Sequence, residues 1–230
     1  MNNDSRAFKD ALYDQFARIG KAVSNPHRLE MLDLLAQGER RVEDLAREAH
    51  LPIANASQHL QALLRAHLVE RRRDGTSIYY RLADDRVFEL WQAIRELGAA
   101  RLAEVDALAR THFDEGRREA IGLVELRERQ RDEPIILLDV RPSHEYRAGH
   151  LPGAISMPVD ELPDRLHELP KRRPIVAYCR GPYCVFADSA VRLLREHGYR
   201  ATRMIDGVPD WQAAGFPVET QPSGRLRNAS

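Results

Sequence analysis

Hydrophobic residues in the first half of the chain recur at the three-to-four-residue spacing of amphipathic helices. This pattern predicts a helix over residues 8–23, a second that starts after Ser24 or Asn25 and ends at Gly38, and a third over 42–49. A fourth helix is predicted over 53–66, with Ala56, Leu60, Leu63 and Leu64 facing inward. Its outer face carries side chains that form hydrogen bonds.

A hairpin and a long helix are predicted next. Residues 69–73 and 76–81 have the composition of two paired strands, joined by the turn pair Asp74-Gly75. From residue 84 to about 109, apolar residues at helical spacing predict one continuous helix. Its apolar surface exceeds what a small domain covers alone, so we expect a homodimer to bury it.

The pattern changes after a polar stretch over residues 111–118, which is the candidate linker. The apolar runs 135–138 and 174–178 predict buried parallel strands, and they alternate with helices near 123–129 and 187–197. The fold class predicted is therefore a two-domain protein, mainly α with a β-hairpin wing first and an α/β domain with a parallel sheet second.

Composition narrows the setting without deciding the partner. Lys and Arg total 35, as do Asp and Glu, and this zero net charge neither supports nor excludes DNA binding. No apolar stretch approaches a membrane span or a secretion signal, so we expect a cytoplasmic protein with no membrane partner. The two cysteines are too few for a disulfide scaffold and suggest reactive thiols.

The first half resembles the ArsR/SmtB family of bacterial winged helix-turn-helix repressors. The resemblance rests on Asn-Pro-His-Arg-Leu at 25–29, Ser-Gln-His-Leu at 57–60 and Gly-Thr-Ser-Ile-Tyr-Tyr at 75–80. It implies a homodimer that reads an inverted repeat in double-stranded DNA with the fourth helix, while the wing contacts phosphates. The implied DNA-binding residues are Asn55, Ser57, Gln58, His59, Gln61, Arg71, Arg72, Arg73 and Arg81.

Many members of that family sense metals, and this sequence departs from their pattern. The third-helix segment at 41–45 has no thiol for a soft metal, and the last helix has no His pair at helical spacing. We therefore expect no metal site and no cofactor. A metal- or metalloid-responsive repressor stays an alternative.

The second half resembles a single rhodanese domain. The matching segments are Leu-Asp-Val-Arg at 138–141, Gly-His-Leu-Pro-Gly-Ala at 149–154, the loop after the strand 175–178, and Gly-Val-Pro-Asp-Trp at 207–211. The expected organisation is a DNA-binding and dimerisation domain over 1–112, a linker over 113–118, a rhodanese-like domain over 119–220 and a polar tail over 221–230.

The loop that follows the strand 175–178 carries the expected chemistry. Cys179 is the candidate catalytic thiolate, which attacks a sulfur donor such as thiosulfate or polysulfide and becomes a persulfide. A strand-to-helix turn offers backbone N–H groups to an anion. The anion-binding loop is accordingly expected to comprise Arg180, Gly181, Pro182, Tyr183 and Cys184. Val185 stands where related phosphatases place a phosphate-binding arginine, which argues against phosphatase activity.

Cys184 has two interpretations. It is either a resolving thiol that closes a disulfide or polysulfide bridge with Cys179, or simply a residue of the first helical turn. Arg141 is expected to pair with Glu145 and support the fold, and Trp211 and Phe216 to belong to the core or to a pocket wall.

Two main hypotheses about function follow from these patterns. The first is a repressor whose DNA affinity responds to sulfane sulfur or redox state through Cys179. The second is a rhodanese-type sulfurtransferase enzyme that carries a DNA-binding domain.

Overall fold

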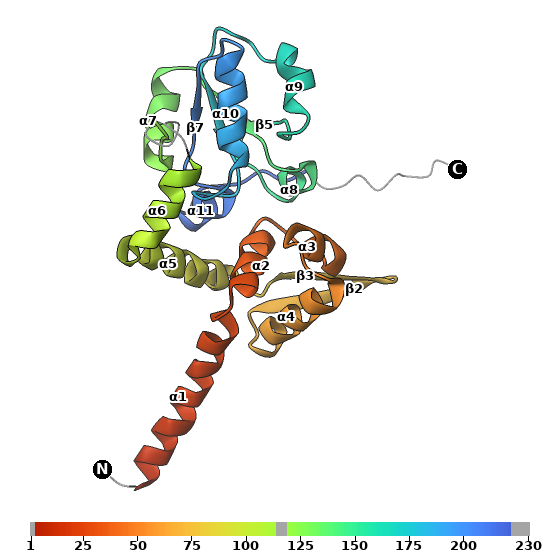
Figure 1. Ribbon diagram of the computed structural model, residues 1–230, viewed down its shortest axis with the longest axis vertical. Helices are drawn as coiled ribbons and strands as arrows, with labels where there is room; N and C mark the ends of the chain where they lie inside the picture. Colours follow the sequence, from red (N-terminus) through yellow and green to blue (C-terminus); the bar gives the residue numbers. More distant parts are fainter. Residues whose placement is uncertain (1–2, 114–118, 222–230) are drawn as a thin grey trace. The chain divides into compact units, whose positions relative to one another are not determined.

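The computed structural model describes residues 3–113 and 119–221. The chain divides into two compact units, Met1–Arg95 and Glu96–Ser230, and each is described here by itself (Figure 1). The predicted linker 113–118 and tail 221–230 lie outside the described residues, apart from Phe113 and Gln221.

Unit 1 consists of helices around one core, with a small antiparallel sheet of strand order β1-β3-β2. Asn25 begins the second helix, because its side chain accepts a hydrogen bond from the Arg28 N–H and Pro26 follows it. The bounds are α1 Asn3–Val23, α2 Pro26–Ala36, β1 Arg40–Arg41, α3 Val42–Glu48, α4 Ile53–Arg65, β2 Val69–Asp74 and β3 Ser77–Leu82. The predicted helices and hairpin are therefore all present.

The turn of the hairpin lies one residue further along than predicted. Asp74 pairs with Ser77, so Gly75 and Thr76 form the two-residue loop. Gly75 has a φ of 59°, while Thr76 is not among the described residues with positive φ. Glycine at the first loop position is typical of the tight turns that match the twist of a hairpin. Asp74-Gly75 was thus the wrong turn pair.

The predicted continuous helix over 84–109 is two helices. Helix α5 spans Asp85–Arg101 and α6 spans Ala103–His112, with Leu102 extended between them at φ −108° and ψ 103°. No proline and no capping side chain marks this break. A nearby signal is Gly98, whose carbonyl accepts the Leu102 N–H and whose helix propensity is low.

Unit 2 contains a four-stranded parallel sheet of order β5-β4-β6-β7. Its strands are β4 Ile136–Asp139, β5 Ile155–Ser156, β6 Ile175–Tyr178 and β7 Ala201–Arg203. In Figure 1 the helices of this unit lie around the sheet. Besides α6 they are α7 Leu123–Asp132, α8 Ser143–Ala148, α9 Leu162–Arg165, α10 Phe186–Glu196 and α11 Val208–Ala213, with a 3-10 turn at Leu166–Glu168.

Alternate residues of the two central strands enter two different cores. Leu138 and Ala177 pack with α9 and α10 on one face, while Leu137 and Val176 pack with α7 and α11 on the other. Strands buried on both faces explain the continuous apolar runs that the sequence shows. Cys179 directly follows β6 and belongs to the first core, so the sheet fixes where the thiol lies.

Candidate functional site

The loop between β6 and α10 places two thiols together. The Cys179 side chain is only 1% exposed, and its Sγ lies 3.5 Å from the Cys184 carbonyl oxygen. The loop is tight, since the Cys184 N–H donates to the Gly181 carbonyl and Gly181 has a φ of 144°. Gly207 packs against it so closely that a Cβ there would lie 2.4 Å from the Arg180 carbonyl oxygen. A side chain at 207 would therefore displace the loop.

The two thiols of this loop differ in acidity. A hydrogen bond from Cys179, together with the backbone N–H groups of Arg180 and Phe186, lowers the pKa of Cys184 to about 7. Burial raises the pKa of Cys179 well above its ordinary value. Of the two thiols, the half-buried Cys184 is therefore the more acidic, while the Cys179 thiolate predicted from the sequence stays a prediction.

The sequence suggested that the Arg180 guanidinium binds an anionic ligand. In the structure this guanidinium binds the carboxylate of Glu145 instead. Its Nε lies 3.0 and 3.2 Å from the two carboxylate oxygens of Glu145, which is completely buried on α8. This bidentate pair ties the loop to α8. The backbone N–H of Arg180, by contrast, faces the Cys184 thiol.

Arg203 is the charged residue that the sequence reading missed. It is 2% exposed at the end of β7, and its Nη2 donates to the carbonyl of Pro182 at 2.7 Å and of Gly181 at 3.4 Å. Its positive charge lowers the pKa of Cys179, in opposition to burial. Among the described residues its Nε and Nη1 have no hydrogen-bond acceptor. Its strand reads Ala-Thr-Arg and follows Arg200, so the sequence carries no clear sign that Arg203 is buried.

Arg203 also contacts the end of α6. Its guanidinium carbon lies 4.8 Å from the centre of the Phe113 ring, and Phe113 is buried. Asp188 on α10 lies 4.0 Å from its Nη1, at the outer limit of an ion pair. Arg203 therefore links the cysteine loop to the end of α6.

The other charged residues that we considered serve the fold. Arg141 pairs mainly with Asp139 at 2.6 Å, and Glu145 lies 4.0 Å from it, so the predicted Arg141–Glu145 pair is the weaker contact. Asp139 competes better because it lies two residues away on the same strand end and binds the guanidinium side-on.

Trp211 and Phe216 pack against each other at 5.0 Å between ring centres in the second core, which confirms that they belong to a core.

The predicted DNA-reading residues of α4 divide by exposure. Asn55 and Gln58 are exposed, whereas Ser57, His59 and Gln61 are half-buried. Gln61 donates to the Tyr80 hydroxyl at 3.3 Å, and the His59 ring lies 5.5 Å from that of His27. The side chains most available to a partner on this helix are therefore Asn55 and Gln58.

The wing arginines also divide, here by their partners. Arg72 pairs with Glu39 at 2.7 Å and Asp74 at 3.0 Å, and these carboxylates raise its pKa. Arg81 pairs with Glu70 at 2.6 Å. Arg71 and Arg73 are exposed and form no ion pair with a described carboxylate. Much of the positive charge that the sequence shows on the wing is thus already neutralised.

Within residues 3–113 and 119–221, no group of three or more His, Cys, Asp and Glu side chains could hold a metal ion. None of the described helices is long and apolar enough to cross a membrane.

A helical core with an antiparallel wing, joined to a parallel sheet with a cysteine loop, defines a winged helix-turn-helix unit fused to a rhodanese-like unit. Residues 25–71 match the family described as bacterial regulatory protein, arsR family, and residues 123–214 match the rhodanese-like domain. An HTH-type transcriptional regulator of Mycobacterium tuberculosis is 48% identical over 211 residues, which are 92% of this chain and 93% of that protein. The chain therefore belongs to the ArsR family of transcriptional regulators and carries a rhodanese-like domain.

Other similar proteins match one unit only. A sulfurtransferase of Allochromatium vinosum is 33% identical over 87 residues, covering 37% of this chain and 79% of that protein. A second match is the solved homodimeric winged helix-turn-helix DNA-binding domain (fragment 1–100) from Mycobacterium bovis. It is 48% identical with a TM-score of 0.39, and the match covers 41% of this chain and 87% of that fragment's chain.

Proposed function

We propose that this regulator is a repressor whose DNA affinity responds to sulfane sulfur through the thiol pair Cys179 and Cys184. The observation that carries the proposal is the tight loop that brings the two cysteines together beside a buried arginine. The buried Cys179 Sγ lies 3.5 Å from the Cys184 carbonyl oxygen, and Arg203 donates to the carbonyls of the same loop. The pKa of Cys184 is lowered to about 7. A pair of this kind can take up a sulfur atom and then close on itself.

In the first step, the Cys184 thiolate takes the proton of Cys179 while the Cys179 sulfur attacks the outer sulfur of a donor such as thiosulfate. A bond forms between the two sulfurs, the sulfur–sulfur bond of thiosulfate breaks, and sulfite leaves with the electron pair. The products are a Cys179 persulfide anion and a neutral Cys184 thiol. Arg203 favours this anion, because its charge already favours the thiolate form of Cys179.

In the second step, the Cys184 sulfur attacks the inner sulfur of the persulfide. The Cys179–Cys184 disulfide forms, and the outer sulfur leaves as hydrosulfide with the proton from Cys184. Across both steps the donor is reduced to sulfite and hydrosulfide, and the two thiols are oxidised. The disulfide is a stable record of exposure to sulfur.

Arg203 offers a route from this chemistry toward the helices. Its Nη2 contacts the carbonyls of Gly181 and Pro182, and its opposite side lies on the Phe113 ring at the end of α6. Closing the disulfide shortens the path between residues 179 and 184, which moves the carbonyls that hold Arg203. We propose that Phe113 transmits this change to α6, and through α5 to the dimer.

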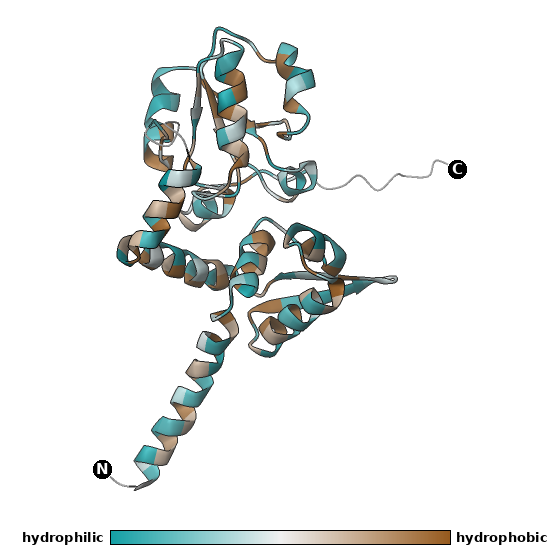
Figure 2. Ribbon diagram, viewed as in Figure 1, coloured by the Kyte–Doolittle hydropathy of each residue, from teal (hydrophilic) through white to brown (hydrophobic). Residues whose placement is uncertain are grey.

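The partners in this proposal are a second copy of the chain and an inverted-repeat operator in double-stranded DNA. Figure 2 shows apolar residues along α1 and α5, and Phe8, Tyr13, Phe16 and Leu97 are each more than half exposed. Burying such large apolar side chains gives about 1.5–3 kcal/mol each. The exposed Asn55 and Gln58 then supply base contacts and the wing supplies phosphate contacts.

The chemical part of the proposal is tested by intact-protein mass spectrometry after thiosulfate or polysulfide treatment. We expect the wild type to lose two hydrogens, as the disulfide forms, and Cys184→Ala to gain one sulfur atom. Cys179→Ala should gain none. Sulfur uptake by Cys179→Ala equal to that of Cys184→Ala would contradict the assignment of the persulfide to Cys179.

A sulfurtransferase with turnover is the second candidate, and the similarity to the Allochromatium vinosum sulfurtransferase favours it. Steady formation of thiocyanate from thiosulfate and cyanide, abolished in Cys179→Ala, would support it. A single stoichiometric reaction per protein would favour sensing instead.

A further inference from the structure

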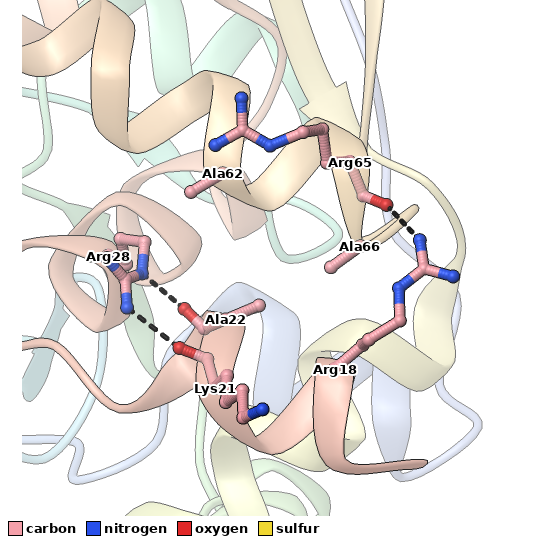
Figure 3. A pocket seen from close by; sticks show the side chains of 7 residues that line it. All are labelled: Arg18, Lys21, Ala22, Arg28, Ala62, Arg65 and Ala66. Atoms are coloured by element: carbon pink, nitrogen blue, oxygen red, sulfur yellow. Dashed lines mark hydrogen bonds between the residues drawn. The ribbon is translucent and has the colours of Figure 1, made fainter. Parts of the chain in front are cut away.

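The DNA-binding unit contains a basic cavity that neither the thiol chemistry nor the DNA contacts use. It has a volume of about 300 Å³ and lies between α1, α2 and α4. Arg18, Lys21, Arg28 and Arg65 surround it, and Ala22, Ala62 and Ala66 form its apolar wall (Figure 3). None of the described residues that line it is acidic.

The arginines from α1 and α2 are held in place by helix ends. Arg18 donates to the Arg65 carbonyl at 2.9 Å, and Arg28 donates to the carbonyls of Ala22 and Lys21, the latter at 2.8 Å (Figure 3). These bonds stabilise the last turns of α4 and α1. They also fix both guanidinium groups beside the cavity, so little side-chain entropy remains to be lost when a ligand binds.

Capping does not explain the other two cations. Among the described residues, neither Lys21 nor Arg65 forms a side-chain hydrogen bond or an ion pair, and none of the four cations is paired with a carboxylate. Four like charges around one cavity repel each other and create a strong positive potential. The pKa of the neighbouring His59 is lowered by burial first and by the charge of Arg28 second.

We propose that this cavity binds a small phosphate-type polyanion, with at least two negative charges shared among these four cations. The hollow is open to solvent on one side, and its volume of about 300 Å³, at the small end of ligand pockets, accommodates one or two tetrahedral phosphate or sulfate groups. The alanine walls leave the room that larger side chains would fill. The ligand would join the end of α1 to the end of α4, and therefore a dimer helix to the DNA-reading helix.

DNA backbone phosphates have the same chemistry, and they are the competing source of the anion. One feature of the cavity favours a free anion. The residues that project outward from α4, Asn55 and Gln58, do not line it.

The test is a titration of the full-length protein with sodium pyrophosphate at constant ionic strength, followed by calorimetry and by Tm. We expect saturable binding that weakens about tenfold or more in Lys21→Gln/Arg65→Gln, because two charged hydrogen-bond donors are removed. The matched control is Lys9→Gln/Arg101→Gln, which removes two exposed charges outside the cavity and should bind like the wild type.

A second variant guards against a change in folding. Ala62→Glu places a carboxylate in the cavity and should abolish pyrophosphate binding while it keeps the wild-type Tm or raises it. The proposal is overturned if the wild type does not bind pyrophosphate, or if all variants bind it equally. It is also overturned if Lys21→Gln/Arg65→Gln weakens only DNA binding, an outcome that assigns these cations to backbone phosphates.

Discussion

At the scale of single residues, the thiol pair has an unequal distribution of acidity. Cys184 is half-buried and has a pKa of about 7, while the pKa of the buried Cys179 is raised. The hydrogen bond from Cys179 is the first cause of the lowered pKa of Cys184. Each thiol therefore sets the reactivity of the other.

The pH dependence of alkylation measures this distribution. Because the thiolate is the nucleophile, the rate of Cys184 modification by iodoacetamide should rise with pH through about 7 and level off above it. In Cys179→Ala the midpoint should move upward, toward the ordinary thiol value, and the rate at pH 7 should fall. An unchanged midpoint in Cys179→Ala would show that the loop N–H groups alone acidify Cys184.

Two glutamines of α4 differ in their predicted roles. Gln58 is exposed, and Gln61 donates to the Tyr80 hydroxyl on the wing. We expect Gln58→Ala to weaken operator binding by about 1–3 kcal/mol with an unchanged Tm. Gln61→Ala should lower the stability of the protein by about 1 kcal/mol. Fluorescence anisotropy and thermal unfolding of both variants check this, and a Gln58→Ala protein with full operator affinity would remove Gln58 from the interface.

At the scale of elements, the sequence predicted the helices and hairpin of the first unit and the two central strands of the second, but not its short elements β5, β7, α8, α9 and α11. Asn25 and Pro26 mark the start of α2 locally, and the buried strands show as apolar runs. The break at Leu102 has no comparable local signal, so periodicity alone joined α5 to α6.

The candidate site, too, was predictable only in part. The cysteine loop was predictable from its motif, but the contacts around it come from distant parts of the chain. Glu145 reaches Arg180 across 35 residues, and Arg203 reaches the carbonyls of Gly181 and Pro182 from β7. The fold therefore decides which arginine binds a carboxylate and which binds the loop carbonyls, and spacing along the chain could not reveal it.

The wing gives a prediction that depends on pairing within one hairpin. Arg72 and Arg81 are engaged by carboxylates, while Arg71 and Arg73 are not paired with any described carboxylate. Replacing Arg71 or Arg73 with glutamine should reduce the slope of log K against log salt by about 1 for each DNA phosphate that the variant no longer neutralises. Arg81→Gln is the matched control with a smaller expected change. Equal slopes for all three variants would contradict the division.

At the scale of the whole molecule, the account requires that loop chemistry changes DNA affinity. Phe113 is the residue to remove, because it joins Arg203 to α6. We expect Phe113→Ala to form the persulfide and disulfide at the wild-type rate, while its operator affinity no longer responds to polysulfide. Thr111→Ala, an exposed change on the same helix, should respond like the wild type. A full response by Phe113→Ala would exclude this route.

The central claim is that a sulfur reaction at Cys179 alters DNA binding. It is tested most directly by titrating operator DNA at fixed salt with reduced protein and with polysulfide-treated protein, for the wild type and for Cys179→Ser. The account predicts a change in the affinity of the wild type of about 5- to 150-fold, the usual range of coupling between two sites, and no change for Cys179→Ser. A wild type whose affinity is the same before and after treatment, or a Cys179→Ser protein that still responds, would contradict it.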